Sequence, residues 1–330
     1  MLFITNRCPK EGPSSKQGIN ASDGRDFHFD LDENSPSNSI YFCSRQKKGS
    51  YREIGSDTFL TELKTAKYRQ LLIYIHGFSN LPEDVFKDVA EFQGLCNSSK
   101  ANEVLVVPVI WPCDNDQGIV KDYWDDQKSA DMSAYSYARV LQKFLEWRAS
   151  EVFNPESDPC FKRMNMLAHS MGNRVLRETL AAWNRYDLAD GVPLIFRNTF
   201  LVAADIVNES LEIGRSGEHI CYASRNVIVY YASDDLALRA SKVSNLKNKI
   251  ASRRLGHTGP EDMDKVPKNV YSVDCDDVNT RYDNPKGHSY FRSNTRKGQP
   301  GKVFQHIFEA LLKGRVATRS VDTSRLSKIS

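Results

Sequence analysis

A serine, a pair of aspartates and a histidine stand at points of the sequence where they could act together in hydrolysis. Ser170 lies in MNMLAHSMGNRV, Met164–Val175, between an apolar run and a helical pattern. Asp234–Asp235 ends the run NVIVYYASDD, and His288 lies in the later GHSYF. A serine hydroxyl needs a base to take its proton, histidine is such a base at neutral pH, and a carboxylate fixes the tautomer of that histidine. These residue types predict acyl transfer through a nucleophilic serine.

The join around Ser170 is too short for an ordinary loop. Leu167 and Ala168 end a buried strand, and an amphipathic helix begins near Arg174. Such a sharp strand-to-helix turn strains its central residue and pushes that side chain out of the sheet. Ala168 and Gly172 are the small residues that a tight turn needs, although alanine departs from the Gly-x-Ser-x-Gly pattern. We therefore predict that Ser170 is a nucleophile on an elbow.

The elements that must position these residues alternate between strands and helices. Apolar runs predict buried strands, and helical spacing predicts the segments between them. The expected strands are QLLIYIHG (70–77), EVLVVPVIWP (103–112), RMNMLAHS (163–170), NTFLVAAD (198–205), NVIVYYASDD (226–235) and NVYSVDC (269–275), with helices at 82–95, 127–147, 173–183, 236–247 and 303–312. This alternation predicts a mostly parallel α/β sheet with helices on both faces. Ligands bind at the carboxyl ends of such strands, so the chemistry should lie there.

The beginning and the end of the chain show this alternation of strands and helices less clearly. The segments MLFITNR (1–7) and SIYFCSR (39–45) read as edge strands separated by a polar loop, so residues 1–60 are mostly irregular. We expect a single α/β domain over residues 1–314, followed by a polar C-terminal tail at 315–330.

Three aspartates compete for the place beside the histidine. Asp235 begins DLALRAS, where it could also serve as a helix N-cap. Asp234 stands one residue closer to its strand, and Asp205 ends the preceding strand. The residues alone leave the acid open among the three, with Asp235 as the first choice. The aspartates that are not used should be caps or hydrogen-bond partners of loops.

The position of each histidine separates the candidate bases. His288 alone follows the last expected strand and precedes the last expected helix, which makes it the predicted base. His257 stands in a polar insertion before the last strand, and His306 stands within the last helix. His76 should brace the loop after the first apolar strand. His169 is the neighbour of the elbow serine and should point elsewhere.

Two backbone amides are candidates for stabilising the oxyanion of a tetrahedral intermediate. Such an oxyanion needs preset donors, each worth about 3–4 kcal/mol. Met171 follows the serine and can supply one N–H, and Phe78 in the first loop can supply the second. Gly77 and Gly172 leave room for the backbones to approach each other.

Composition and missing motifs argue against several other classes of function. The 45 basic and 42 acidic residues give a net charge of only +3, so nucleic-acid binding is not expected. Without GxGxxG, GxxxxGK[ST], HxxxH or clustered Cys and His, we expect no cofactor and no metal.

The longest apolar runs, near 71–75 and 104–111, are too short to cross a membrane, and the N-terminal run is too short for a signal peptide. Seven cysteines without framework spacing favour a cytoplasmic location.

With these residues in hand, the chain resembles the α/β-hydrolase superfamily, and more narrowly a bacterial group labelled as an uncharacterised α/β-hydrolase domain family. The likeness rests on LFITNR, YIHGFSN, VIWP, LAHSMGNR, YYASDDLAL and GHSYF. It covers roughly residues 2–312, although 252–268 looks like an insertion, and the order serine, acid, histidine is that of the superfamily. The resemblance implies an α/β-hydrolase fold and a triad of Ser170, Asp235, by its place before LAL, and His288.

The predicted function is a cofactor-independent serine hydrolase that acts on a carboxylic ester of a small molecule through an acyl-enzyme. A binding protein on a degenerate hydrolase fold is the competing interpretation, and an amidase or acyltransferase would share the triad. The superfamily does not select a substrate, and the oligomeric state is not visible in the sequence. The aromatic-rich segment 111–137 could either wall the pocket or pack in the core.

Overall fold

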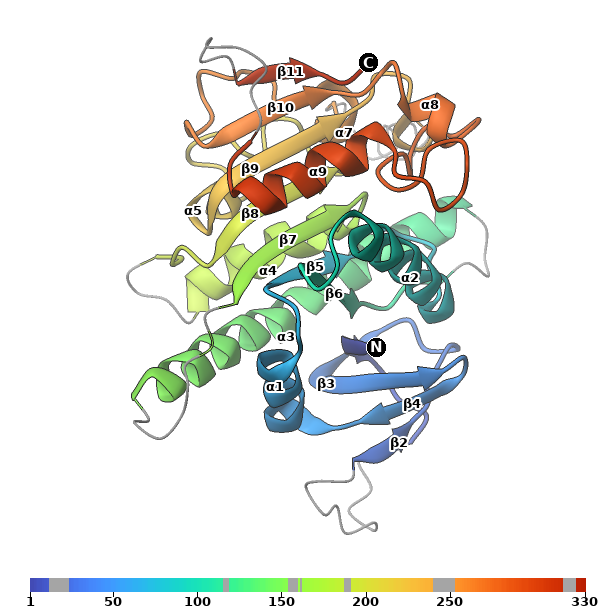
Figure 1. Ribbon diagram of the computed structural model, residues 1–330, viewed down its shortest axis with the longest axis vertical. Coiled ribbons are helices and arrows are strands. Elements are labelled where there is room, and N and C mark those ends of the chain that lie inside the picture. Colours follow the sequence, from blue (N-terminus) through green and yellow to red (C-terminus); the bar gives the residue numbers. More distant parts are fainter. Residues whose placement is uncertain are drawn as a thin grey trace.

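The computed structural model describes residues 1–11, 24–114, 119–153, 160, 162–186, 191–239, 253–316 and 325–330. Within these residues the strands form one eleven-stranded sheet, which runs from β11 at the top of Figure 1 to β2 at the bottom. In order across the sheet, the strands are β11 (Leu326–Lys328), β10 (Val270–Asp274), β9 (Ser224–Tyr231), β8 (Phe196–Val202), β7 (Arg163–His169), β5 (Gln70–Ile75), β6 (Val104–Ile110), β1 (Leu2–Arg7), β3 (Pro36–Lys47), β4 (Ser50–Glu53) and β2 (Arg25–Phe27). The helices are α1 (Gly55–Thr65), α2 (Pro82–Ser99), α3 (Ile119–Phe153), α4 (Gly172–Tyr186), α5 (Glu218–Tyr222), α7 (Leu255–Thr258), α8 (Asn279–Tyr282) and α9 (Lys302–Lys313).

Most of the sheet is parallel, as the sequence predicts. Neighbouring strands from β11 through β6 run parallel, and β1 is also parallel to β6. Beyond β1, the strands β3, β4 and β2 pair antiparallel. The six strands expected between residues 70 and 275 are all present.

The N-terminal strands differ from the prediction of edge strands at 1–7 and 39–45. Strand β1 lies between β6 and β3, and β3 lies between β1 and β4. Polar side chains in β1 are buried with partners, since the Thr5 hydroxyl donates to Ile110 O at 2.7 Å. A polar residue that finds its partner inside the sheet looks, in the sequence, the same as one that faces water.

The chain leaves the centre of the sheet in two directions. After β5, helix α2 leads to β6 on one side, whereas after β7, helix α4 leads to β8 on the other side. Right-handed connections in opposite directions place their helices on opposite faces. Figure 1 shows α2 and α9 in front of the sheet, and their apolar residues form a different cluster from those of α3 and α4. The carboxyl ends of β5 and β7 thus meet where such sheets form a ligand crevice.

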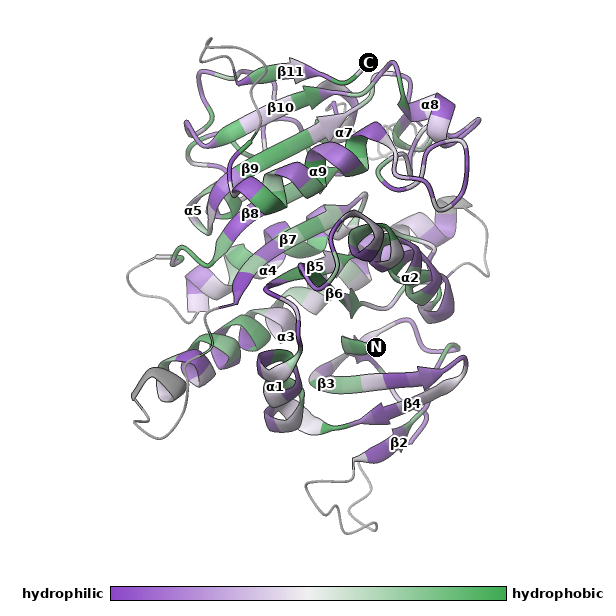
Figure 2. Cartoon of the chain, in the orientation of Figure 1, coloured by the Kyte–Doolittle hydropathy of each residue, from purple (hydrophilic) through white to green (hydrophobic). Residues whose placement is uncertain are grey.

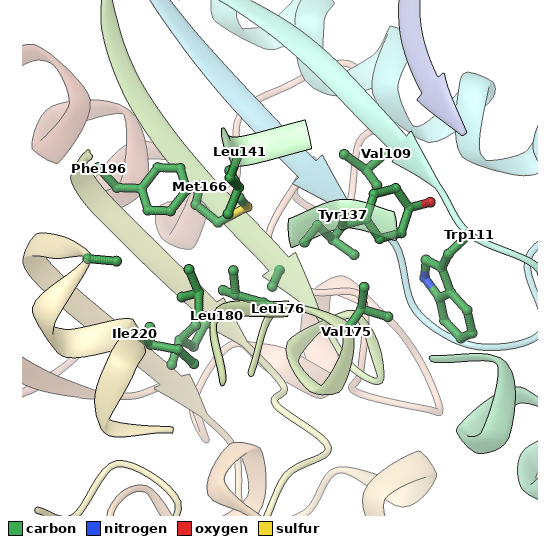
Figure 3. Close-up of a cluster of buried hydrophobic side chains, with 14 of the residues drawn as sticks. Val109, Trp111, Tyr137, Leu141, Met166, Val175, Leu176, Leu180, Phe196 and Ile220 are labelled. Atoms are coloured by element: carbon green, nitrogen blue, oxygen red, sulfur yellow. The ribbon is translucent and has the colours of Figure 1, made fainter. Parts of the chain in front are cut away.

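Apolar side chains fill the space on both faces of the sheet. Figure 2 shows the central strands largely hydrophobic, and α9 with hydrophobic and hydrophilic bands that alternate along the helix. On the opposite face, Figure 3 shows side chains of the sheet, α3, α4 and α5 that meet in one cluster: Val109, Trp111, Met166, Phe196, Tyr137, Leu141, Val175, Leu176, Leu180 and Ile220. The helix that follows the elbow is therefore held by apolar packing on this face of the sheet.

The predicted helices are present, with different ends. Helices α2, α4 and α9 correspond to the predicted segments and are a few residues longer. Helix α3 begins at Ile119 rather than at 127, and its first turns bury Tyr123 and Asp126. Of the helix expected at 236–247, residues 236–239 are helical and the rest lies outside the described residues.

Two segments expected to lie apart from the sheet are attached to it. Residues 326–328 of the expected C-terminal tail form β11 and pair with β10, while 317–324 lie outside the described residues. In the expected insertion at 252–268, the N–H groups of Leu255 and Gly256 donate to carbonyls just after β8 at 2.8 and 2.9 Å. Backbone pairing of this kind leaves no hydrophobic pattern, so the sequence does not reveal it.

At the amino ends of the strands, buried side chains form a row of hydrogen bonds across the sheet. Asn226 Nδ2 donates to Asn198 Oδ1 at 2.9 Å, and Asn198 Nδ2 donates to Asn165 Oδ1 at 3.0 Å. Asn165 Nδ2 donates to Gln70 Oε1 at 3.2 Å, and Gln70 Nε2 donates to Glu103 Oε1 at 2.9 Å. We call these five residues the amide row. It spans β9, β8, β7 and β5 and ends just before β6.

The amide row also binds the carboxyl end of α9. The last carbonyls of a helix lack partners within the helix. Asn198, Gln70 and Asn226 each donate to one carbonyl in this region, at 3.4, 3.1 and 3.3 Å, namely those of Ala310, Leu311 and Gly314. The row therefore joins the sheet to the helix that closes one of its faces.

Replacing Asn198 by leucine is expected to lower the free energy of unfolding by about 2–4 kcal/mol. The change removes the donor to Asn165 Oδ1 and the nearest acceptor of Asn226 Nδ2, and an unpaired buried polar group costs about 1–3 kcal/mol. Urea unfolding followed by circular dichroism measures the effect. The same change at Asn97, on the exposed face of α2, should stay within about 0.5 kcal/mol of the wild type. Equal losses in the two variants would contradict the role of the row.

Candidate active site

The turn that holds Ser170 is as short as the sequence suggests. Strand β7 ends at His169 and α4 begins at Gly172, so Ser170 and Met171 form the whole connection. Ser170 has a φ of 52°, a left-handed conformation that costs a non-glycine residue about 1–3 kcal/mol. Its N–H donates to the last carbonyl of β8 at 3.0 Å, and its carbonyl accepts from Asp205 N at 3.1 Å. The surrounding backbone thus fixes the strained elbow.

Two glycines allow the elbow to approach the end of β5. A Cβ atom on Gly172 would lie 2.5 Å from Ile75 O and 2.6 Å from His76 O, far inside contact distance. A Cβ atom on Gly77 would lie 3.0 Å from Ser170 Cβ. Any larger residue at Gly172 would push the elbow away from the first loop.

His288 and Asp235 meet at the carboxyl edge of the sheet. His288 Nδ1 and Asp235 Oδ2 are 2.7 Å apart, and Asp235 Oδ1 accepts from Leu238 N at 3.0 Å. Asp283 holds the loop before this contact, since its Oδ2 accepts from the N–H groups of His288 and Ser289 at 2.8 and 2.7 Å. Asp235 is fully buried, and a carboxylate only accepts. The proton of the His288 ring therefore lies on Nδ1.

The other two aspartates of the sequence prediction have partners elsewhere. Asp234 accepts a hydrogen bond from Asn279 Nδ2 at the start of α8. Asp205 accepts from the Tyr123 hydroxyl at 2.8 Å and pairs with Arg254 Nε at 3.1 Å. Of the three acids left open by the residues, the one before LAL is the one that contacts the histidine.

Ser170 and His288 line one cleft of about 570 Å³ at the carboxyl ends of β5 and β7. Phe78 and Tyr123 form part of its wall, and Met171 is buried next to Ser170. In the part of the chain that the structure describes, neither the Phe78 amide nor the Met171 amide donates a hydrogen bond. Both predicted oxyanion donors therefore lack an acceptor within the described part of the protein.

Residues 53–296 match the family described as "Alpha/beta hydrolase of unknown function (DUF900)". The chain belongs to this family. Its parallel sheet with helices on both faces, and its serine in a strand-to-helix turn, are those of the α/β-hydrolase fold. The resemblance inferred from the sequence motifs is confirmed at the level of superfamily and fold.

Three solved structures to which this α/β hydrolase is similar have low sequence identity to it. Est1E from Butyrivibrio proteoclasticus is 11% identical, with a TM-score of 0.36 over 75% of this chain and 87% of that chain. Phospholipase PlaB from Legionella pneumophila is 10% identical, with a TM-score of 0.30 over 66% of this chain and 40% of the phospholipase. Its complex with thio-NAD gives 12% identity and a TM-score of 0.25 over 62% and 38%. The chain thus spans about two fifths of the phospholipase, and no curated protein matches it significantly.

In this α/β hydrolase, His76 braces the first loop, as the sequence predicts. His76 Nδ1 donates to Gly77 O at 2.8 Å, and Nε2 accepts from Trp111 N at 3.2 Å. Burial lowers the pKa of His76 to about 4, so the ring is neutral and both hydrogen bonds persist at neutral pH.

The prediction that His169 points away from the site is wrong. His169 lines the cleft, its ring centroid lies 4.8 Å from that of His288, and its Nε2 is 3.2 Å from His288 O. Burial and the neighbouring His288 lower the pKa of His169, so its ring is neutral. The alternation of side chains along a strand fails here because the strand ends and the backbone turns at Ser170.

The two other histidines that follow Asp235 in the sequence do not line the cleft. His257 lies in α7 and His306 lies in α9, where its Nδ1 is 2.8 Å from the Tyr230 hydroxyl. Their positions agree with the sequence prediction.

The surroundings of His288 set its proton affinity. Burial acts to lower its pKa, but the charge and hydrogen bond of Asp235 raise it, as does the charge of Asp205. The balance is a pKa above the ordinary value of 6.5. A base with a raised pKa accepts a proton more readily, but it is already protonated over a wider range of pH.

The aromatic segment 111–137 has both of the roles that the sequence left open. Tyr123 lines the cleft, and its ring meets that of Phe78 edge-on at 5.7 Å. Trp111 and Tyr137 are buried in the core instead.

Sequence reasoning missed two asparagines that hold the backbone of the site. Asn173 Nδ2 donates to Ser170 O at 3.0 Å. Asn80 Nδ2 donates to Gly77 O and Phe78 O at 3.1 and 2.8 Å. Their only sequence signal is residue type, because an asparagine close to a turn often bonds to the local backbone.

Two further findings concern metals and membranes. Among the described residues, no group of three or more His, Cys, Asp or Glu side chains is placed to hold a metal ion. None of the helices in the same ranges combines the length and the apolar character that crossing a membrane requires.

Proposed function

We propose that this α/β hydrolase is a serine hydrolase of carboxylic esters, with Ser170 as nucleophile, His288 as base and Asp235 as the acid that orients the base. The observation that carries the proposal is the 2.7 Å hydrogen bond between His288 Nδ1 and Asp235 Oδ2, in a cleft that Ser170 also lines. Because Nδ1 keeps its proton, Nε2 is the nitrogen that can accept one from the serine. The strained elbow supports the same assignment, since it presents a nucleophile at the end of its strand.

The reaction would proceed in two halves through an acyl-enzyme. His288 Nε2 takes the proton of Ser170 Oγ while that oxygen bonds to the acyl carbon, and the amides of Phe78 and Met171 donate to the oxyanion. The intermediate then breaks its bond to the alcohol, which leaves with the proton from His288. Water next gives a proton to His288 and attacks the acyl carbon, and the acid leaves as Ser170 regains its proton.

A fluorophosphonate probe, together with a panel of p-nitrophenyl esters, tests this proposal. We expect the probe to label Ser170 and at least some of the esters to be hydrolysed, with both lost in Ser170→Ala. Full labelling of that variant would overturn the assignment. Turnover no higher than that of the variant, across all acyl lengths, would favour a binding protein on the same fold. Cleavage of amides, or transfer to an alcohol, would keep the triad but change the reaction class.

The pH profile of the reaction should show the raised pKa of His288. His288 must be unprotonated at Nε2, so kcat/KM falls as the pH drops through this pKa. We expect the midpoint of that fall above 6.5, and a lower midpoint in Asp235→Asn because the charge that raises the pKa is gone. The measurement is kcat/KM for one ester between about pH 5 and about pH 9. A wild-type midpoint at or below 6.5 would show that burial outweighs the carboxylate.

We infer a small-molecule substrate and a reducing compartment such as the cytoplasm. The volume of the cleft, about 570 Å³, falls within the usual range for small-molecule sites. All seven cysteines are free thiols, which supports a reducing compartment.

A further inference from the structure

A buried carboxylate lies next to the loop that carries Phe78. Asp126 belongs to α3 and is fully buried. Its Oδ2 accepts from Ser79 N at 2.9 Å, and its Oδ1 accepts from Asn34 Nδ2 and from Asp114 N, both at 3.1 Å. Burial raises the pKa of Asp126 to about 6, so the group is mostly ionised at neutral pH. One charged side chain thus connects three segments that are distant in the sequence.

The peptide group between Phe78 and Ser79 is held at both ends. Asn80 Nδ2 donates to Phe78 O at 2.8 Å, while the Ser79 N–H donates to Asp126 at 2.9 Å. Asn80 Nδ2 also donates to Gly77 O at 3.1 Å, which fixes the peptide on the other side of Phe78. Ser79 has a φ of 56°, and a serine keeps this left-handed conformation when its surroundings impose it.

We propose that Asp126 is a positioning residue that aims the Phe78 amide at the oxyanion, a role that rests on the serine-hydrolase function proposed above. Asp126 does not line the cleft and would act through Ser79. A charged acceptor forms a stronger hydrogen bond than a neutral one, so the carboxylate can hold the strained residue in place. An oxyanion donor works only within about 2.7–3.1 Å of its target, so a small shift of the loop weakens it.

Ser129 offers a matched control for the structural role of Asp126. It lies one turn further along α3, is 5% exposed, and its hydroxyl donates to Asn34 O at 2.6 Å. It therefore anchors the same N-terminal segment that Asp126 anchors. It makes no hydrogen bond to the 77–80 loop.

The test compares Asp126→Asn with Ser129→Ala. Two of the three donors, Asn34 Nδ2 and Asp114 N, share one carboxylate oxygen. An asparagine satisfies both of them when its oxygen takes that place, which turns its NH₂ group toward Ser79 N, so the Ser79 contact is lost. We expect kcat, and the rate constant for labelling of Ser170 by a fluorophosphonate, to fall about ten- to a hundredfold in Asp126→Asn. KM should change less than about twofold, and the pH midpoint should stay in place because His288 is not touched. Ser129→Ala should keep the wild-type rate constants.

A melting curve for each variant gives its folded fraction, and the labelling rate constant is divided by that fraction, so that a loss of stability is not mistaken for a slower reaction. If Asp126→Asn does not fold, Asp126→Glu keeps the charge but moves the carboxylate, and it should show the same separation of kcat from KM. Wild-type labelling rates in the Asp126 variants would overturn the inference and leave the proposed function standing. An equal slowing of labelling in Ser129→Ala would also overturn the inference and leave the proposed function standing. A wild-type protein that is not labelled at Ser170 would instead refute the proposed function itself.

Discussion

Replacing Ser170 by alanine is expected to lower kcat for ester hydrolysis about 10⁶-fold, because the change removes the atom that bonds to the acyl carbon. Removal of the nucleophile from a serine protease has an effect of this size. The fold should persist, since the elbow is held by main-chain hydrogen bonds to β8 and from Asp205 N that alanine retains. Steady-state kinetics on the best ester of the panel, with a melting curve for each protein, measures the change.

Another serine of the same cleft provides the control. Ser289 lines the cleft, and its main-chain N–H donates to Asp283 at 2.7 Å, a contact that Ser289→Ala preserves. We expect this variant to keep its kcat within about tenfold of the wild type, as its hydroxyl has no part in the proposed chemistry. If Ser289→Ala lost turnover while Ser170→Ala kept it, the nucleophile would lie on the histidine loop and not on the elbow.

Replacing Asp235 by asparagine is expected to lower kcat about 10⁴-fold, the scale seen when the equivalent acid of a serine protease is changed. Asp235 receives two hydrogen bonds, from His288 Nδ1 at 2.7 Å and from Leu238 N at 3.0 Å. Asparagine can satisfy Leu238 with its oxygen, which turns its NH₂ group toward His288. The ring must then present a lone pair at Nδ1 and carry its proton on Nε2, where it cannot accept one from the serine.

Variants of the two neighbouring acids, Asp234 and Asp205, test whether the loss of activity is specific to Asp235 or follows from the removal of any nearby negative charge. Asp234→Asn keeps an acceptor for Asn279 and should cost much less activity. Asp205→Asn weakens a buried ion pair with Arg254, so its stability should fall, but the folded fraction should keep most of its kcat. The largest loss in Asp205→Asn would place the acid one strand earlier, and the largest loss in Asp234→Asn would shift it by one residue. Full activity in all three variants would show that His288 works without any of these carboxylates or is not the base.

The sequence contains enough to locate the elbow and the histidine, because both predictions depend on the order of elements. Ser170 follows a buried strand directly, and His288 is the histidine between the last parallel strand of the prediction and the last helix. The acid is harder, because Asp234 and Asp235 are adjacent and identical in type. Which one faces the site depends on how the turn after β9 continues. In the structure the two acids differ in their partners. Asp235 accepts from the Leu238 N–H, and Asp234 accepts from the Asn279 side chain. The sequence does not show these contacts.

What the sequence could not predict depends on contacts between distant segments. His169 is the last residue of its strand, and its contact with His288 exists because the loop that carries His288 passes the end of β7. Asp126 lies just outside the helix that the sequence predicts at 127–147, and three donors from other parts of the chain make its burial possible. Strand β11 is three residues of ordinary polarity whose pairing is made by the backbone. Polar residues carry no periodic signal when their partners are remote.

The amide row affects the folding of the chain, because it links the register of the central strands to the docking of α9. A slip of one residue would turn every side chain of a strand to the other face of the sheet, and it would also separate each amide of the row from its neighbour. The row also donates to three carbonyls at the end of α9, and these belong to Ala310, Leu311 and Gly314, near the end of the chain. A nascent chain that stops before α9 would hold amide donors against an open apolar face, a costly arrangement in a water-poor interior. The last helix thus completes the hydrogen bonding of these donors when it docks on the sheet and supplies its carbonyls.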